Sequence, residues 1–160
     1  MRKEDSVFFK VYGVESENNT LIKLNKQHYV LFYGFFADGI GNYRLRKDYY
    51  RKPTIIDIRT DIENVIDERT SQKILSGFEF EGVNIWLSQE NQINFRSVVS
   101  FPVKFKVGEN EGVSVYKTFS HQEELSVFNN AIADYIHSCL NEGWDAKDNL
   151  DCEKFKEVLR

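Results

Sequence analysis

Alternation of apolar and polar residues predicts four strands before residue 50. Polar or glycine-containing runs at 15–19, 25–26 and 37–42 separate these strands, which cover 6–14, 20–24, 28–36 and 43–47. The third strand, HYVLFYGFF, is apolar on both faces, as in a central strand covered twice or a strand whose second face meets a partner chain. Pro53 closes this part, because proline cannot continue a strand ladder and restricts the residue before it to extended conformations.

Apolar residues at three- and four-residue steps predict two long helices, at 54–76 and 121–142. Each begins with a Ser or Thr followed three residues later by an acid, as in a capping box, and each is followed by a glycine that stops it. The capping pairs are Thr54 with Asp57 and Ser120 with Glu123, and the stopping glycines are Gly77 and Gly143. Trp144 is placed to pack back on the last turn of the second helix. The tail at 151–160 has enough apolar residues at helical spacing for a short docking helix.

Between the long helices, the pattern predicts two hairpins and a short helix. The first hairpin turns at Glu81-Gly82, and Trp86 points away from the face that its apolar neighbours share. Ser88 is a candidate N-cap for a short helix at 89–99. The second hairpin, at 103–118, turns across the sequence GENEG and has one solvated face.

These elements predict an α+β fold, in which an N-terminal antiparallel sheet is followed by a helix, β-hairpins and a long C-terminal helix. Residues 1–52 are expected to form an N-terminal β module, a possible attachment region, and residues 53–160 an α+β domain. A chain of 160 residues is long enough to bury a sizeable core. We expect no membrane segment and no signal peptide, because no apolar run in the sequence is long enough for either.

Charge and chemistry-bearing residues narrow the classes of function. The net charge of −4 and the pI near 5.5 argue against a dedicated nucleic-acid-binding domain. The three histidines lie far apart at 28, 121 and 137, and we find no metal-ligand spacing, nucleophile elbow or phosphate-binding loop. We therefore expect no metal, no cofactor and no enzymatic activity. Cys139 and Cys152 have neither disulfide nor metal spacing and are expected to be free thiols.

The strongest functional candidate is the segment at 43–52, YRLRKDYYRK, which contains five basic residues, one acid and three tyrosines. Basic residues interleaved with aromatics suit phosphate binding and base stacking, and Tyr and Arg are also enriched at protein interfaces. An amphipathic edge strand, whose basic side chains deter edge pairing, explains the pattern equally well. Of the two functional interpretations we favour protein contact, because the acidic chain offers nucleic acid no long-range attraction. The predicted partner-binding residues are Tyr43, Arg44, Arg46, Tyr49, Tyr50 and Arg51.

Several separated groups of residues carry a resemblance to a known family. They are Ile74 to Phe78, Val83, Trp86-Leu87-Ser88, Glu90-Asn91-Gln92, Asn94, Pro102-Val103, Phe105-Lys106, Gly108, Tyr116, Thr118-Phe119, Glu142-Gly143-Trp144 and Lys147-Asp148. The string ILSGF, VNIWLS, ENQ and N resembles a domain-of-unknown-function family that is common in bacteriophages and prophages of anaerobic gut bacteria, usually among tail and other virion genes. The resemblance covers about 52–150, and this chain departs from it in having a shorter helix after the ENQ motif.

The resemblance implies a non-enzymatic structural protein of the virion, associated with tail, baseplate or fibre. Its expected partners are other phage structural proteins and further copies of itself in a symmetric multimer. Its expected location is the virion, after synthesis in the host cytoplasm. One alternative is a tail-fibre assembly chaperone that is absent from the mature particle. The other is a nucleic-acid-contacting module that uses the segment at 43–52.

Overall fold

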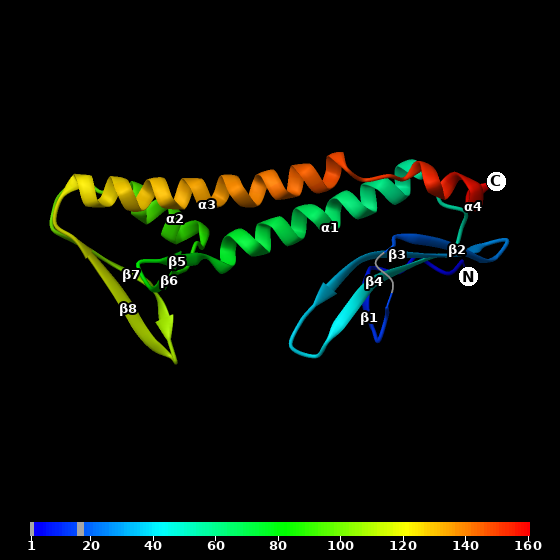
Figure 1. Cartoon of the computed structure of the whole chain (residues 1–160), viewed down its shortest axis with the longest axis horizontal. Helices are drawn as coiled ribbons and strands as arrows, with labels where there is room; N and C mark the ends of the chain where they lie inside the picture. Colours follow the sequence, from blue (N-terminus) through cyan, green and yellow to red (C-terminus); the bar gives the residue numbers. More distant parts are fainter. Residues whose placement is uncertain (1, 16–17) are drawn as a thin grey trace. The chain divides into compact units, whose positions relative to one another are not determined.

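The computed structural model describes residues 2–15 and 18–160, so residues 16 and 17 of the predicted polar run lie outside the described residues. The predicted α+β class and order of elements are confirmed (Figure 1). The elements are β1 (Phe9–Tyr12), β2 (Thr20–Asn25), β3 (His28–Ala37), β4 (Asn42–Tyr49), α1 (Ile55–Ser76), β5 (Phe78–Phe80), β6 (Val83–Ile85), α2 (Gln89–Arg96), β7 (Val103–Asn110), β8 (Val113–Phe119), α3 (Gln122–Asp148), the short 3₁₀ helix η1 (Glu153–Phe155) and α4 (Lys156–Leu159). None of the described helices is both long and apolar enough to cross a membrane.

The chain groups into two compact units. The first unit contains Met1–Asn64 together with Leu150–Arg160, and the second contains Val65–Asn149. The change from the first unit to the second therefore falls within α1, and the C-terminal tail belongs to the first unit. The division into domains at residue 52 stays a prediction.

The first unit is built on an antiparallel sheet with strand order β1-β4-β3-β2. β3 lies inside the sheet, so the apolar strand at 28–36 is central, as one of the two alternatives predicted. β4 is also internal, and the edge-strand interpretation of this segment was therefore wrong. The physical reason is that β1 pairs with the outer side of β4. A hydrogen bond from the Ser6 N–H to the Asp48 carbonyl, at 2.8 Å, extends this pairing.

One face of this sheet packs on helices. Tyr49 is fully buried, and its hydroxyl donates to the Asp61 carboxylate of α1 at 2.5 Å. The Lys47 ammonium lies 2.9 Å from the same carboxylate. The predicted capping box at the start of α1 is confirmed, because Thr54 and Asp57 exchange bonds of 2.8 and 3.0 Å. α4 lies against β2, so the predicted docking of the tail helix is also found.

The second unit begins with the predicted hairpin, which turns at Glu81 (φ 51°) and Gly82 (φ 77°). Gly77, between α1 and β5, has φ 81°, and a Cβ there would lie 1.7 Å from the Ile85 carbonyl oxygen. Only glycine therefore fits at this helix end. Ser88 is the N-cap of α2 as predicted, since its hydroxyl accepts from the Asn91 N–H at 3.2 Å.

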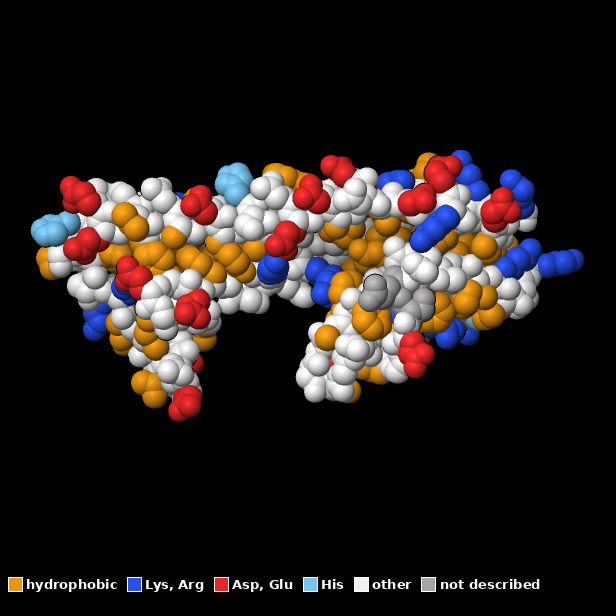
Figure 2. Space-filling view, viewed as in Figure 1, with side chains coloured by type: hydrophobic (Ala, Val, Ile, Leu, Met, Phe, Trp, Pro, Cys, Tyr) orange, Lys and Arg blue, Asp and Glu red, His pale blue; other side chains and the backbone are white. Residues whose placement is uncertain are grey.

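Aromatic rings form the centre of the second unit. The Phe128 ring of α3 lies 5.0 to 5.2 Å from three other rings, those of Phe80, Phe95 and Phe119. These spacings are typical of favourable aromatic pairs. Apolar side chains gather along the side of α3 that faces the hairpins (Figure 2). The core therefore joins α2 and both hairpins to α3.

The C-terminal half of α3 corrects a prediction. The helix continues through Gly143 to Asp148. A Cβ at position 143 would lie 2.6 Å from the Thr70 hydroxyl oxygen of α1, which explains why this position is a glycine. Gly143 thus permits a close approach of two helices within the second unit, and it does not stop α3. Trp144 is 51% exposed and does not pack back as predicted.

The start of α3 and the second hairpin also differ in detail from the prediction. His121 is the N-cap and makes no side-chain cap bond, while the Ser120 N–H donates to Glu124 at 3.1 Å. The expected Ser120–Glu123 box is therefore not formed. The GENEG connection is shorter than expected, because β7 runs to Asn110 and leaves a two-residue turn of positive φ before β8. Both cysteines are buried and free, as predicted.

Candidate functional site

The six predicted partner-binding residues do not form one surface. Side chains alternate along β4, so Tyr43 and Tyr49 share one face while Arg44 and Arg46 share the other. Tyr43, Arg44 and Tyr49 are buried, and Arg46 and Tyr50 are half-buried. Only Arg51, just beyond β4, is exposed. The buried members of the set have little surface to offer a partner.

The basic side chains of this segment have acidic partners in the same unit. Arg46 forms a two-pronged pair with Asp48 at 2.8 and 3.1 Å. Burial alone would raise the pKa of Asp48, but the Arg46 guanidinium outweighs it and holds the pKa below its ordinary value. Arg51 lies 3.1 Å from Asp5 and 2.8 Å from Asp57. The positive charge that the sequence suggests is therefore largely compensated locally.

Arg44 has a structural role at an irregularity in the sheet. The register between β3 and β4 shifts between Tyr33 and Phe36, where Gly34 adopts φ 72°. The Arg44 side chain donates to the Gly34 carbonyl at 3.2 Å and also to the Asn18 carbonyl. Burial lowers the pKa of Arg44, but the guanidinium stays protonated and charged, as arginine does in proteins generally. Arg44 thus donates to one carbonyl at the bulge, that of Gly34, and to one in the segment before β2, that of Asn18.

Arg46 belongs to a row of side chains that crosses the sheet on the face opposite Tyr49. Phe9 and Phe32 lie directly across from Arg46 on the neighbouring strands. The Arg46 guanidinium carbon is 5.7 Å from the Phe9 ring centre and 5.9 Å from that of Phe32. Phe9 is 43% exposed, and Ile22 of β2, on the same face, is 41% exposed. We call Phe9, Ile22, Phe32 and Arg46 the open sheet face.

A small basic groove lies at one end of the same unit. The His28 ring stacks on Tyr50 with centres 4.7 Å apart, and the Lys3 ammonium lies 4.1 Å from the Tyr50 ring centre. Arg2, Asn25 and Gln27 complete its lining. Tyr50 of the predicted set thus lines a hollow.

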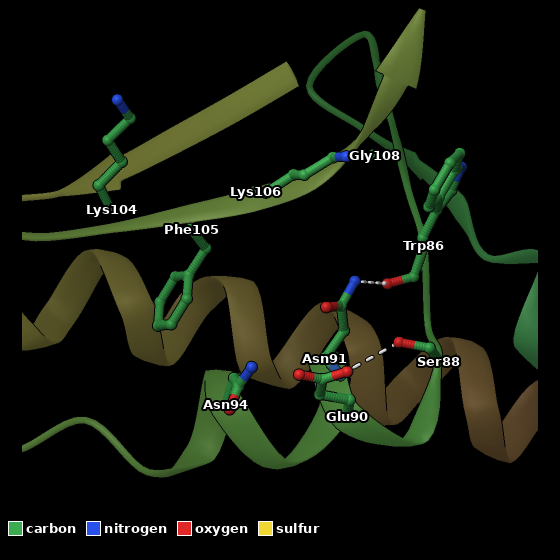
Figure 3. A pocket seen from close by; sticks show the side chains of 9 residues that line it. All are labelled: Trp86, Ser88, Glu90, Asn91, Asn94, Lys104, Phe105, Lys106 and Gly108. Atoms are coloured by element: carbon green, nitrogen blue, oxygen red, sulfur yellow. Dashed lines mark hydrogen bonds between the residues drawn. The ribbon is translucent and has the colours of Figure 1, made fainter. Parts of the chain in front are cut away.

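A second candidate site lies in the second unit and was not predicted. It is an open groove of about 460 Å³ between α2 and β7, with Trp86 at one end (Figure 3). The lining residues are Trp86, Ser88, Glu90, Asn91, Asn94, Lys104, Phe105, Lys106 and Gly108. All of them except Lys104 belong to the groups that carry the family resemblance. We call this hollow the tryptophan groove.

Backbone contacts fix Trp86 at the end of the tryptophan groove. Its N–H donates to the Val107 carbonyl of β7 at 2.7 Å, and its carbonyl accepts from the Asn91 amide at 3.0 Å. A Cβ at Gly108 would lie 3.4 Å from two indole atoms, so the ring rests against the bare backbone there. The indole remains 39% exposed. An aromatic ring is thereby held in a set position with part of its surface free.

The charges of the tryptophan groove nearly balance. The Lys106 ammonium lies 2.8 Å from Glu109, and this hydrogen bond raises the pKa of the lysine. Lys104 also lines the groove, and its ammonium lies 4.2 Å from the Tyr116 ring centre and pairs with no acidic side chain among the described residues. Glu90 on α2 makes no ion pair with any described residue. Among the described residues, the lining therefore presents one unpaired carboxylate, one unpaired ammonium and the two asparagine amides.

The comparisons with known proteins leave the chemistry of these surfaces to be argued from their geometry. No family model, no curated protein and no solved structure matches the chain. Among residues 2–15 and 18–160, no group of three or more His, Cys, Asp or Glu side chains is arranged to hold a metal ion.

Proposed function

We propose that the chain is a non-enzymatic structural protein of a bacteriophage virion, associated with tail, baseplate or fibre. It acts by contact with other phage structural proteins and with copies of itself, and it is made in the host cytoplasm before assembly. The family resemblance supports the phage assignment. The open sheet face supports protein contact, and it is the observation on which this proposal chiefly rests.

The composition and order of the open sheet face suit a protein interface. It combines exposed Phe9 and Ile22 with the Arg46 guanidinium, which lies 5.7 and 5.9 Å from the Phe9 and Phe32 ring centres. Aromatic residues and arginine are enriched at interface centres. Asp48 already holds the Arg46 guanidinium in a two-pronged pair. Less side-chain entropy is then lost when a partner covers the face.

The nucleic-acid alternative has less support. A nucleic-acid-binding surface needs cations that are free to replace counterions on phosphates. In the segment at 43–52, Arg46, Lys47 and Arg51 each lie within 3.1 Å of an aspartate oxygen. A protein interface does not require free cations.

Quantitative mass spectrometry of purified, nuclease-treated particles tests the proposal. We expect the chain at a constant ratio to a known tail protein of the same phage or induced prophage. Abundance in the lysate with absence from mature particles would contradict a structural role and favour the assembly chaperone.

A variant links particle incorporation to the open sheet face. Phe9→Ser with Ile22→Ser should reduce incorporation by about tenfold or more, the effect of losing interface anchors. Each side chain is more than half covered in the free chain, so each substitution should also lower its stability by about 1–2 kcal/mol. Circular dichroism must therefore show that the variant is folded before its incorporation is compared. Ile40→Ser with Val99→Ser is the matched control, since both side chains are exposed and lie outside the open sheet face. Equal incorporation of the two double variants would contradict the assignment of the interface to this face.

A further inference from the structure

We propose that the tryptophan groove binds a neutral oligosaccharide, with one sugar ring stacked on the Trp86 indole. This site goes beyond the proposed structural function, because it would take a small polyhydroxylated ligand in the second unit and does not involve the open sheet face.

The first reason is the presentation of the indole. A pyranose ring has an apolar face of C–H groups, and a fixed and partly exposed aromatic ring complements that face. Trp86 is 39% exposed although its backbone is bonded to β7 and α2. The ring itself rests against the backbone at Gly108, and this contact limits its motion before a ligand arrives, which lowers the entropic cost of binding.

The second reason is the set of polar groups beside the indole. The Asn94 amide and the Glu90 carboxylate line the groove and make no hydrogen bond with described residues (Figure 3). Asn91 donates one N–H to the Trp86 carbonyl, and its own side-chain oxygen is left as an acceptor. Sugar hydroxyls both donate and accept, so they match a site that mixes amide donors with amide and carboxylate acceptors.

The third reason is charge, which favours a neutral ligand over an anionic one. Lys106 is paired with Glu109, so the unpaired charges of the lining are the Glu90 carboxylate and the Lys104 ammonium, which cancel. The Glu90 carboxylate on the opposite wall would repel a phosphate or a sugar acid. A single strand of nucleic acid could still use Trp86 and Lys104, and the experiment therefore includes one.

The chain contains only two tryptophans, which makes the test direct. In Trp144→Phe the sole indole is Trp86, and its emission should change when maltohexaose, cellohexaose or chitohexaose is added to the full chain. Weak carbohydrate binding corresponds to a Kd near a millimolar, so titrations should extend to about 10 mM. The matched control is Trp86→Phe, whose remaining indole, Trp144, should not respond to any of the sugars.

Calorimetry with the sugar that gives a response tests whether that sugar binds in the tryptophan groove. Trp86→Leu should weaken binding by about tenfold or more, and Asn94→Ala and Glu90→Gln by about fivefold each, as expected for losing a stacked ring or one hydrogen bond. Glu123→Ala, at an exposed position of the second unit outside the groove, should leave sugar affinity within about twofold. Trp144 emission shows whether Trp86→Leu remains folded, because both tryptophans lie in the second unit.

Three outcomes would overturn the proposal. The first is the absence of a response to every sugar in Trp144→Phe. The second is sugar binding that Trp86→Leu and Asn94→Ala leave unchanged. The third is a response to oligothymidylate alone that falls with salt and with Lys104→Ala, which would assign the groove to single-stranded nucleic acid.

Discussion

At the scale of single residues, Gly143 sets how closely α3 and α1 approach within the second unit. A Cβ at this position would lie 2.6 Å from the Thr70 hydroxyl oxygen, closer than packed atoms allow. Overpacking of this kind costs about 1–3 kcal/mol, and the better helix propensity of alanine returns about 1 kcal/mol. We therefore expect Gly143→Ala to lower the free energy of unfolding by about 1 kcal/mol, measured by urea denaturation followed by circular dichroism.

Thr70→Ala provides the control for this contact. It removes the hydroxyl and methyl groups that a side chain at 143 would meet. In the Thr70→Ala background, Gly143→Ala should raise the free energy of unfolding by about 1 kcal/mol, because only the helix propensity remains. The same destabilisation in both backgrounds would mean that the contact with Thr70 is not its cause.

Tyr49 is a second residue whose effect has a defined sign. Its buried hydroxyl donates to Asp61, which also pairs with Lys47. At neutral pH, Tyr49→Phe should lower the free energy of unfolding by about 1–2 kcal/mol, since a hydrogen bond to a carboxylate is lost. Urea denaturation measures the change, and an equally stable variant would contradict the role of this bond.

The same residue predicts a pH dependence. Burial, and then the bond to Asp61, raise the pKa of Tyr49 well above its ordinary value of 10.0. Above about pH 10 the unfolded chain loses this proton and the folded chain keeps it, so wild-type stability falls by about 1.4 kcal/mol per pH unit. The phenylalanine variant lacks this loss, and the other tyrosines contribute equally to both proteins. The two stabilities should therefore converge as pH rises from about 9 to about 11, whereas a constant difference would contradict the raised pKa.

At the scale of elements, two serines that precede helices have different roles. The Ser88 hydroxyl caps α2, but no side-chain bond caps α3 after Ser120. Ser88→Ala should therefore lower the free energy of unfolding by about 1 kcal/mol, and Ser120→Ala by much less. Thermal denaturation of the two variants provides a matched comparison. Equal losses would show that Ser120 does contribute a cap in solution.

Local patterns were sufficient to predict most elements of this fold. Alternation, the Thr54–Asp57 box, the Ser88 cap and Gly77 act over a few residues, and each has the predicted role in the structure. Gly143 was wrongly predicted to stop α3. The close contact that requires a glycine there is with Thr70 on another helix, and such a contact leaves no signal in the local sequence. Local sequence therefore determined helix starts and turns better than it determined where α3 ends.

Contacts between distant segments explain what the sequence did not predict about the candidate sites. β4 is internal because β1, more than thirty residues earlier, pairs with its outer side. The acids that compensate its basic residues include Asp5 and Asp61 from outside the strand. The tryptophan groove joins α2 to β7, and only the clustering of resemblance motifs at both could have suggested it. Charge counted along one segment says little about the charge that a partner meets.

At the scale of the whole molecule, the tail is part of the first unit. Residues 150–160 return to the sheet unit, where Cys152 and Phe155 are buried and α4 lies against β2. Burial also raises the pKa of the Cys152 thiol, so this cysteine remains protonated and unreactive at neutral pH. Residues 150–160 are therefore part of the packed structure of the first unit.

Phe155→Ala tests whether the tail stabilises the first unit in particular. Truncating a fully buried phenylalanine costs about 3–5 kcal/mol, and Phe155 is 2% exposed. Amide exchange measured by mass spectrometry should accelerate by about a hundredfold in peptides from β2 and β3, as expected for the loss of about 3 kcal/mol. Both tryptophans lie in the second unit, so the urea midpoint of tryptophan emission should move much less. Glu157→Ala, at an exposed position of α4, is the control and should change neither signal. Equal losses of protection in β2 and in β7 would instead mean that α1, which runs through both units, makes them unfold together.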